Sequence, residues 1–312
     1  MTPTVLILSG STMELSMIMT KLPAPGEELT DEGGVGYLPH SSGAEIAAAL
    51  RALGARAVLL TKLGRDAHGK KFFDYYTKLN IDTSCIKVDA KEPTGLLVNL
   101  RTAEEPPRRI LYPGANQTLS EENIREAFDK IRPDALFMTL DAPSEITLMT
   151  AQIAKARQIP IFIDPSSTAD KELLSQLPPI EAFLPNEHEA EAYTEILPLG
   201  VDVSLRCALT LYRKASIKNL IFKMGTRGSF FFDGKHCDFT TPPAGIKIAP
   251  GVTGLGAMYS AAFTLCYLGG ATVKDSMRYA TAAASLAGSR GGGIESYPTS
   301  SEIIRFCDEN QI

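Results

Sequence analysis

The sequence predicts an α/β fold with a mainly parallel central sheet and a small β lid. From about residue 135 onward, short apolar runs alternate with helical segments of about 10–15 residues, which is typical of βαβ units. Two β-rich stretches, at about 12–38 and 95–112, fall outside this alternation and are expected to converge as the lid. No repeat or low-complexity linker divides the 312 residues, so a single domain is expected.

The first third of the chain is expected to contain two strands and two helices of the main fold. Val5–Leu8 is a β-rich run, and Ala57–Thr61 is the next one. Between them, the alanine-rich stretch Ser42–Leu53 predicts a helix that ends at Gly54. The amphipathic stretch Lys70–Leu79 predicts a second helix.

A lid hairpin and then the regular alternation are expected in the rest of the chain. The strands of the hairpin would be Leu96–Leu100 and Arg109–Leu111, joined by an exposed turn at Glu104–Pro107. The alternation predicts strands at 135–138, 159–164, 182–184, 219–223 and 229–233, and helices at 143–157, 171–177, 187–194 and 203–215.

Composition argues against several classes of protein. Hydrophobic residues make up 44% and charged residues 21%, which is ordinary for a soluble globular domain. The net charge of −5 argues against a broad nucleic-acid surface, and the apolar stretches are shorter than the roughly 20 residues of a membrane span. Residues 1–10 lack a basic leader and are expected to form a strand instead of a signal peptide. The five cysteines show no CxxC spacing, which favours buried thiols in a reducing cytoplasm over a zinc site or disulfides.

The stretch from Gly251 to Ala257 reads as a glycine turn that opens into the apolar helix Met258–Leu268. A helix start carries unpaired N–H groups and the positive end of the helix dipole, and glycines beside it let an anion approach the backbone. The turn therefore predicts a phosphate site. It contains no Asp, Glu, His, Ser or Cys that could act as a base or a nucleophile.

Polar residues that follow the strands are further candidates, because open parallel sheets bind ligands beyond the carboxyl ends of their strands. Glu14 and Asp141 each follow an apolar strand, and Glu45 lies in the first turn of an expected helix. Each also has a structural explanation. Glu14 fits a solvated turn, and Asp141 fits a helix cap. Glu45 fits the dipole of a helix that Ser41 or Ser42 caps.

Two later loops carry candidates for metal and nucleotide binding. Asn186 and Glu189 open an acidic helix, where carboxylates usually interact with the dipole. An Asn and a Glu three residues apart at a strand end can also hold hydrated Mg²⁺, which keeps most of its waters. Gly225 and Gly228 join two apolar strands, and either a hairpin turn or a ligand close to the backbone would require glycines there. His188 is expected to be a surface residue.

The order of these motifs resembles the ribokinase-like, or PfkB-type, carbohydrate kinases over nearly the whole chain. The second signature of that family, Asp-Thr-x-Gly-Ala-Gly-Asp, aligns with residues 251–263. The other matching segments are Gly43–Asp82, Tyr112–Asn116, Leu184–Glu189, Lys223–Gly228, Ala282–Ala287 and Ser289–Gly292. The resemblance implies a ribokinase-like three-layer sandwich.

The resemblance also implies an ATP- and Mg²⁺-dependent transfer of the γ-phosphoryl group to a hydroxymethyl oxygen of a sugar or nucleoside. The implied anion hole is formed by Gly254, Leu255, Gly256 and Ala257. The implied substrate-binding residues are Glu14, Ser42, Gly43, Glu45 and Asp141. The implied nucleotide-binding residues are Asn186, Lys223, Gly225 and Gly228, and Glu189 would bind Mg²⁺ through water. The lid would exclude water from the reaction.

The departures from the family pattern affect the base and the sugar contacts. The second Asp of the signature is the catalytic base of the family, and Ala257 stands at that position. Gly251 replaces the first Asp, which helps to shape a monovalent-cation site in many members, and this weakens the expectation of such a cation. His40-Ser41 replaces a Gly-Gly pair, Glu45 replaces the sugar-binding Asn, and Glu14 replaces an early sugar-binding Asp.

These departures leave three explanations open. The chain binds ligands without efficient catalysis, or Glu14, Glu45 or Asp141 serves as the base, or Ala257 is an engineered replacement. The simultaneous changes at 251, 41 and 45 favour natural divergence.

The loss of a general base typically costs about 10²–10⁴-fold in rate. We therefore expect a sugar kinase with reduced or unusual catalysis. The alternatives are an inactive sensor of nucleotide or sugar and a structural subunit paired with an active paralogue. An exposed edge in the lid would allow two subunits to form a homodimer.

Overall fold

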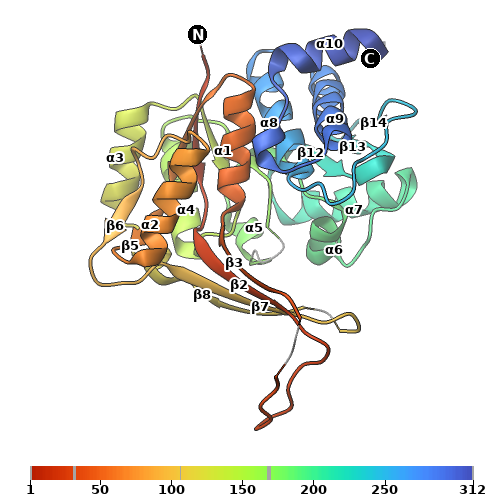
Figure 1. Ribbon diagram of the computed structural model, residues 1–312. Helices are drawn as coiled ribbons and strands as arrows, with labels where there is room; N and C mark the ends of the chain where they lie inside the picture. The colour runs from red at the N-terminus through yellow and green to blue at the C-terminus, as the bar shows by residue number, and fades with distance from the viewer. Residues whose placement is uncertain (1, 31–32, 106, 167–169, 311–312) are drawn as a thin grey trace.

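A central sheet organises the computed structural model, which describes residues 2–30, 33–105, 107–166 and 170–310 (Figure 1). In these residues, eight strands form the sheet in the order β14-β13-β12-β11-β10-β9-β1-β4. Neighbouring strands from β4 to β12 pair in parallel, whereas the β12–β13 and β13–β14 pairs are antiparallel. The strands are β1 (Thr4–Leu8), β4 (Arg56–Leu60), β9 (Ala135–Met138), β10 (Ile161–Ile163), β11 (Ile180–Phe183), β12 (Ile217–Lys223), β13 (Ser229–Phe232) and β14 (Cys237–Thr240). The prediction of a mainly parallel sheet is confirmed.

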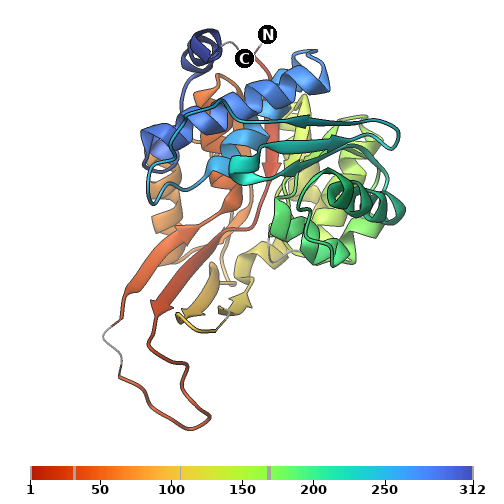
Figure 2. The same ribbon diagram turned by 90° about the vertical axis from the view of Figure 1, so that its right-hand side faces the viewer.

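Helices cover both faces of the sheet, so the body has three layers (Figures 1 and 2). Successive strand residues point to opposite faces. Val5 and Ile7 belong to the core that includes α1, α2, α8, α9 and α10, whereas Leu6 and Leu8 belong to the core that includes α3 to α7. The helices are α1 (Ser42–Ala52), α2 (Ala67–Lys78), α3 (Glu121–Ile131), α4 (Ser144–Ala156), α5 (Leu173–Gln176), α6 (Glu187–Thr194), α7 (Val201–Lys214), α8 (Leu255–Leu268), α9 (Val273–Arg290) and α10 (Ser300–Asn310).

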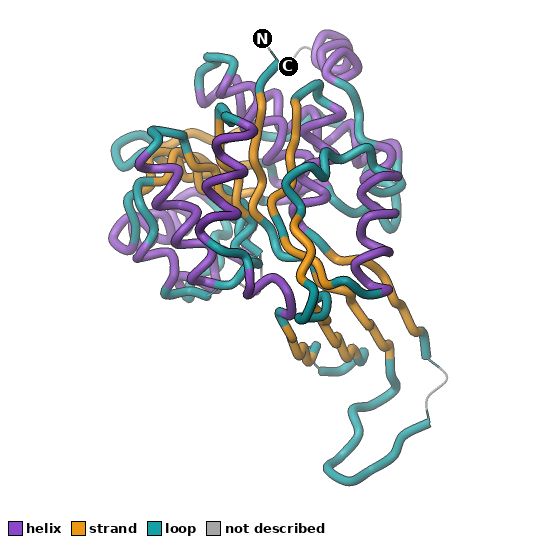
Figure 3. The backbone as a smooth tube through the Cα atoms, turned by 90° about the vertical axis from the view of Figure 1, so that its left-hand side faces the viewer, coloured by secondary structure: helices purple, strands orange, loops and turns teal. Residues whose placement is uncertain are grey.

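The lid is a second sheet that projects from the end of the body where β1 ends (Figures 1 and 3). Its strands in the described chain are β2 (Thr12–Ile18), β3 (Val35–His40), β7 (Gly95–Arg101) and β8 (Arg108–Tyr112), in the order β3-β2-β7-β8. Both β-rich stretches contribute strands to this sheet, and β7 pairs with β8 in antiparallel fashion; the turn predicted at Glu104–Pro107 includes Pro106, which lies outside the described residues. The prediction could not give their register, in which β2 pairs with β7 in parallel and with β3 in antiparallel fashion.

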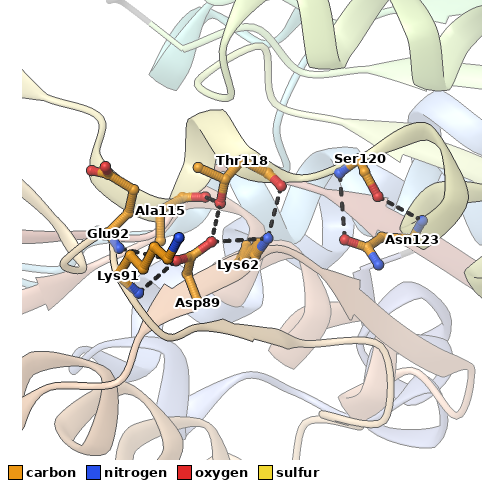
Figure 4. A network of polar contacts seen from close by, with 8 residues as sticks. All are labelled: Lys62, Asp89, Lys91, Glu92, Ala115, Thr118, Ser120 and Asn123. Carbon is orange, nitrogen blue, oxygen red and sulfur yellow. Dashed lines mark hydrogen bonds and ion pairs between the residues drawn. The ribbon is translucent and has the colours of Figure 1, made fainter.

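A polar network holds the base of the lid hairpin (Figure 4). Lys62 lies on the short strand β5 (Lys62–Gly64), and its Nζ donates to the Thr118 carbonyl at 2.8 Å and lies 3.1 Å from Asp89 Oδ2. Asp89, at the end of β6 (Lys87–Asp89), also accepts from the Thr118 hydroxyl and from the backbone N–H groups of Glu92 and Lys91. These bonds, the Glu92 and Lys91 N–H bonds foremost, hold the pKa of Asp89 well below its usual value. The network ties the segment that enters β7 to the 3-10 turn η1 (Gly114–Thr118) that follows β8.

Several elements differ from the predicted ones. Helix α3 was not predicted, although Ser120 and Asn123 form a reciprocal capping box at its start. Helix α2 begins at Ala67, three residues earlier than predicted, because Asp66 caps it by accepting from Gly69 N at 2.8 Å. The predicted helix 171–177 is only the single turn α5. Cys237 on the edge strand β14 is exposed, so the prediction of buried thiols is wrong there. None of the described helices is long and apolar enough to cross a membrane.

Gly43 gives a test of the packing between α1 and β1. Its N–H donates to Ser9 Oγ at 2.9 Å, and an added Cβ would overlap the Ser9 side chain and lie 3.1 Å from Leu59 Cδ1. We expect Gly43→Ala to lower the free energy of unfolding by about 1–3 kcal/mol, because the buried site is overpacked. Urea denaturation would measure the loss. Gly36→Ala is the control, since its Cβ would have no neighbour closer than 3.8 Å, and equal losses in both variants would contradict the expectation.

Candidate active site

A cavity of about 310 Å³ lies where the lid meets the carboxyl ends of the parallel strands. Strand ends and the loops after them contribute Gly10, Thr139, Asp141, Asp164, Pro165, Ser166, Asn186 and Lys223. Helix starts and the turns before them contribute Ser42, Glu45, Ile46, Glu189, Gly254, Gly256 and Ala257. The lid and its ends contribute Thr12, Glu14, His40, Leu97, Asn99, Arg109 and Leu111. This is the edge at which open parallel sheets bind ligands.

The glycine turn forms one wall of the cavity, at the start of α8. Gly254 precedes the helix with φ of +77°, and a Cβ there would overlap the Tyr297 hydroxyl, so the position requires glycine. Tyr297 donates from that hydroxyl to the Gly254 carbonyl at 2.8 Å and holds the turn in place. No described side chain caps the first turn of α8. Its first N–H groups therefore have no described side-chain partner, and the phosphate site predicted there remains a prediction.

A buried cation lies beside this turn. Lys223, at the end of β12, is 8% exposed, and its Nζ is 2.5 Å from Asp164 Oδ1. Ser260 in α8 donates to Asp164 Oδ2 at 2.7 Å. A Cβ on Gly256 would lie 3.5 Å from Lys223 Nζ, so the ammonium group is adjacent to the open amides. The open amides and the Lys223 ammonium thus give this end of the cavity hydrogen-bond donors that suit an anion.

Asn186 and Glu189 form a capping box at the start of α6. The Asn186 side chain accepts from Glu189 N at 2.9 Å, and Glu189 Oε2 accepts from Asn186 N at 2.7 Å. The structural explanation of this pair is thus correct, yet both residues also line the cavity. Burial raises the pKa of Glu189 to about 7, with Lys223 opposing the shift and Asp164 adding to it. Among the described residues, no group of three or more His, Cys, Asp and Glu side chains is arranged to hold a metal directly.

Asp141 and Glu14 line the polar end of the cavity, below the lid. Asp141 accepts from Gly10 N at 2.7 Å and from Thr139 Oγ1 at 2.6 Å, so it ties the end of β1 to the end of β9. The interpretation of Asp141 as a helix cap is wrong, because α4 begins at Ser144 without a side-chain cap. Glu14 accepts from Asn99 Nδ2 at 2.7 Å, so the solvated-turn explanation is also wrong.

Glu45 lies in the first turn of α1, which Ser41 caps by accepting from Ala44 N. Within the described part of the chain, the Glu45 carboxylate makes no hydrogen bond and no ion pair. Burial raises its pKa, with smaller effects from His40, Asp164 and Lys223. Among the described carboxylates that line the cavity, Glu45 is thus the one without such a contact, although its place in the first turn of α1 suits the helix dipole.

Some of the predicted site residues do not line the cavity. Gly43 is buried against Ser9, and the side chain of Leu255 is directed elsewhere than into the cavity lining. Gly225 begins the short 3-10 turn η2 (Gly225–Arg227) and Gly228 follows it, between the antiparallel strands β12 and β13, as a hairpin turn requires. Their roles in binding nucleotide remain predictions.

Asp164, Asn99 and Arg109 line the cavity, and the sequence analysis did not single them out. A signal for Asp164 was present, because an acidic residue followed by proline ends an apolar strand there. Asn99 and Arg109 face each other on β7 and β8, and only the register of the lid brings them to the cavity.

The raised pKa of Glu189 predicts a pH effect on stability. The folded protein binds the Glu189 proton more tightly than the unfolded chain, because its pKa rises from the ordinary 4.5 to about 7. This contribution to stability is complete below pH 4.5 and is lost as the pH rises through 7. Between pH 4.5 and 8, the parent should lose this contribution, and the Glu189→Gln variant has none to lose. Without ligands, we therefore expect the difference in free energy of unfolding, variant minus parent, to rise by on the order of 1–3 kcal/mol over this range. Denaturant titrations at both pH values would measure this, and a constant difference would contradict it.

Comparisons with known proteins agree with this architecture. Residues 13–300 match the pfkB family of carbohydrate kinases. Ribokinase of Haemophilus influenzae is 27% identical over 296 residues, which cover 91% of this chain and 92% of that protein. Deoxyribokinase of Salmonella typhi is 22% identical over 309 residues, which cover 98% and 99% of the two chains.

Solved structures show the same fold. Arabidopsis thaliana ribokinase, complexed with ribose and ATP, superposes with a TM-score of 0.77 at 23% identity, over 98% of this chain and 99% of that one. Ribokinase of Giardia lamblia gives a TM-score of 0.80 at 18% identity, over 99% of each chain. The ribokinase-like three-layer fold is thereby confirmed, and this chain belongs to the pfkB family of carbohydrate kinases.

Proposed function

We propose that this chain is an ATP-dependent kinase that transfers the γ-phosphoryl group to a hydroxymethyl oxygen of a sugar or nucleoside, at a rate reduced by Ala257. One observation carries the proposal. A single cavity joins the open amides at Gly254–Ala257 and the Lys223 ammonium to a polar end with Glu14 and Asp141. Phosphate charge suits the first end, and sugar hydroxyls suit the second. The complex of Arabidopsis thaliana ribokinase with ribose and ATP supports these two classes of ligand.

The chain's own residues supply most of what phosphoryl transfer requires, because this reaction depends on positioning and charge stabilisation. The α8 amides and Lys223 would stabilise the transferring group. Glu14, Asn99 and Asp141 would orient the acceptor. The lid would keep water from the transferring group.

Mg²⁺ fits the donor set near Asn186 and Glu189. A carboxylate and an amide oxygen at the cavity wall suit an ion that keeps most of its waters and takes few protein ligands. When bound, Mg²⁺ would neutralise phosphate charge. Gly251 offers no side-chain oxygen, and we assign no monovalent cation to its position.

Ala257→Asp tests whether the cavity is otherwise complete. Ala257 is 8% exposed and lines the cavity, so an Asp at this position would add a carboxylate, which can accept a proton, to the cavity lining. We expect Ala257→Asp to raise kcat for the preferred acceptor by about 10²-fold or more. Ala257→Asn is the matched control, because it has nearly the same shape but cannot accept the proton. Steady-state assays over sugars and nucleosides would measure the gain, and equal effects of both variants would contradict the account.

The absence of a base at position 257 also favours a second candidate, a sensor that binds nucleotide or sugar without turnover. Such a protein would gain thermal stability with each ligand. Neither the sensor nor its Ala257→Asp variant would form a phosphorylated sugar. Calorimetric binding combined with product analysis separates the two candidates.

We also propose a homodimer formed through the lid. Ile18 and Leu38 are 57% and 67% exposed, and the register places them on the face of the lid that carries Glu14. An exposed apolar face next to a cavity suits a second copy of the same surface.

Leu38→Lys should therefore shift the protein from dimer to monomer at micromolar concentration. Light scattering after size-exclusion chromatography would measure the mass. Ile304→Lys on α10, at a residue that is 55% exposed, is the control and should remain dimeric. A monomeric parent chain would contradict the dimer.

A further inference from the structure

The proposed kinase leaves one proton without an acceptor. As a hydroxyl oxygen attacks the γ-phosphorus, its proton must move to a base, and Ala257 offers only a methyl group. Five carboxylates line the cavity and could take that proton: Glu14, Glu45, Asp141, Asp164 and Glu189.

Four of these carboxylates already have partners. Asp164 lies between Lys223 and Ser260, and Asp141 accepts from Gly10, Thr139 and Ser9. Glu14 accepts from Asn99 Nδ2 at 2.7 Å, and Glu189 accepts from Asn186 N at 2.7 Å. Partners of this kind fix the orientation of a carboxylate toward the protein and occupy lone pairs that a substrate proton would need. Burial raises the pKa of Glu189 to about 7, but its carboxylate is held by Asn186 N and is the proposed Mg²⁺ ligand.

Glu45 differs from all four. In the described residues its carboxylate has no hydrogen-bond partner, and burial raises its pKa, as it does that of Glu189. The charged and titratable groups that act on it, or on which it acts, are His40, Lys223, Asp164, Tyr75 and Tyr297. A free, partly desolvated carboxylate is the form that general bases take in enzymes.

Glu45 also lines the same cavity as Ala257, on a helix that packs against α8. Helix α1 packs against α8, and Ala44, Ala48 and Ala261 share one core (Figure 1). Glu45 interacts electrostatically with Tyr297 and with Lys223, and both of these residues lie beside the glycine turn. Tyr297 donates to the Gly254 carbonyl, and Lys223 Nζ lies 3.5 Å from the place of a Cβ on Gly256.

We propose that Glu45 is the general base of this chain and accepts the proton of the attacking hydroxyl in place of a side chain at position 257. This inference rests on the proposed kinase function. In the step, the acceptor oxygen bonds to the γ-phosphorus while the bond from that phosphorus to the bridging oxygen of the nucleoside triphosphate breaks. The hydroxyl proton moves to Glu45. The products are a sugar phosphate, a nucleoside diphosphate and a protonated Glu45, which returns its proton to water.

Four chains test the proposal: the parent, Glu45→Gln, Ala257→Asp and the double variant. Each is assayed with ATP, Mg²⁺ and the acceptor that Ala257→Asp uses fastest in a panel that includes ribose. We expect Glu45→Gln to lower kcat of the parent by about 10²-fold, at the lower end of what a general base contributes, because Ala257→Asp is expected to add about 10²-fold more. The double variant should match Ala257→Asp, because the new carboxylate makes Glu45 unnecessary. The acidic limb of the parent's pH–kcat profile should also disappear in Glu45→Gln.

Three outcomes would overturn the assignment. Equal losses from Glu45→Gln in the parent and in Ala257→Asp would show that Glu45 holds the sugar and takes no proton. An unchanged rate in Glu45→Gln would exclude it outright. A parent without turnover beside an active Ala257→Asp would also refute the base while leaving the kinase site intact. If none of the four chains transfers phosphate, the proposed kinase function itself fails. Glu122→Gln, on exposed α3, is the control and should retain the parent rate.

Discussion

The ion pair between Lys223 and Asp164 is the interaction on which the cavity depends. It joins the ends of β12 and β10, and Ser260 links it to α8. Both charged groups are largely buried, and a buried pair is strongly destabilised when one partner is removed. The pair keeps an ammonium group beside the open amides of α8, where phosphate charge is expected. Asp164 therefore has a positioning role that requires no contact with the acceptor.

The parallel sheet explains why these residues meet. Strands buried on both faces can place polar side chains only at their ends, and all the parallel strands end at the same edge. Helices α1 and α8 begin at that edge and pack side by side. The lid leaves the same edge through β2, and its residues line the cavity there. The network around Lys62 holds the base of its hairpin.

Much of this arrangement could be predicted from the sequence, because the signals are local. Apolar runs gave the strands, and the glycine turn before an apolar helix gave the anion site. The role of Asp141 could not be predicted, since its partner Gly10 is 131 residues away in the chain. The same holds for Asn99 and Arg109, which reach the cavity only through the register of the lid. Asp164 was assigned to a strand, although its charge and the following proline mark the end of one.

In the proposed kinase, the cavity would combine a phosphate end with an altered base and altered sugar contacts. Its acidic groups, Glu14, Glu45, Asp141, Asp164 and Glu189, outnumber Lys223 and Arg109, and such a lining would favour acceptors rich in hydrogen-bond donors.

A single-turnover experiment tests the central claim most directly. Excess parent protein is mixed with ATP, Mg²⁺ and a panel of sugars and nucleosides, and the products are followed by mass spectrometry. The account predicts a phosphorylated acceptor that forms slowly and only when the protein is present. Tight binding of both ligands without any phosphorylated product would contradict it.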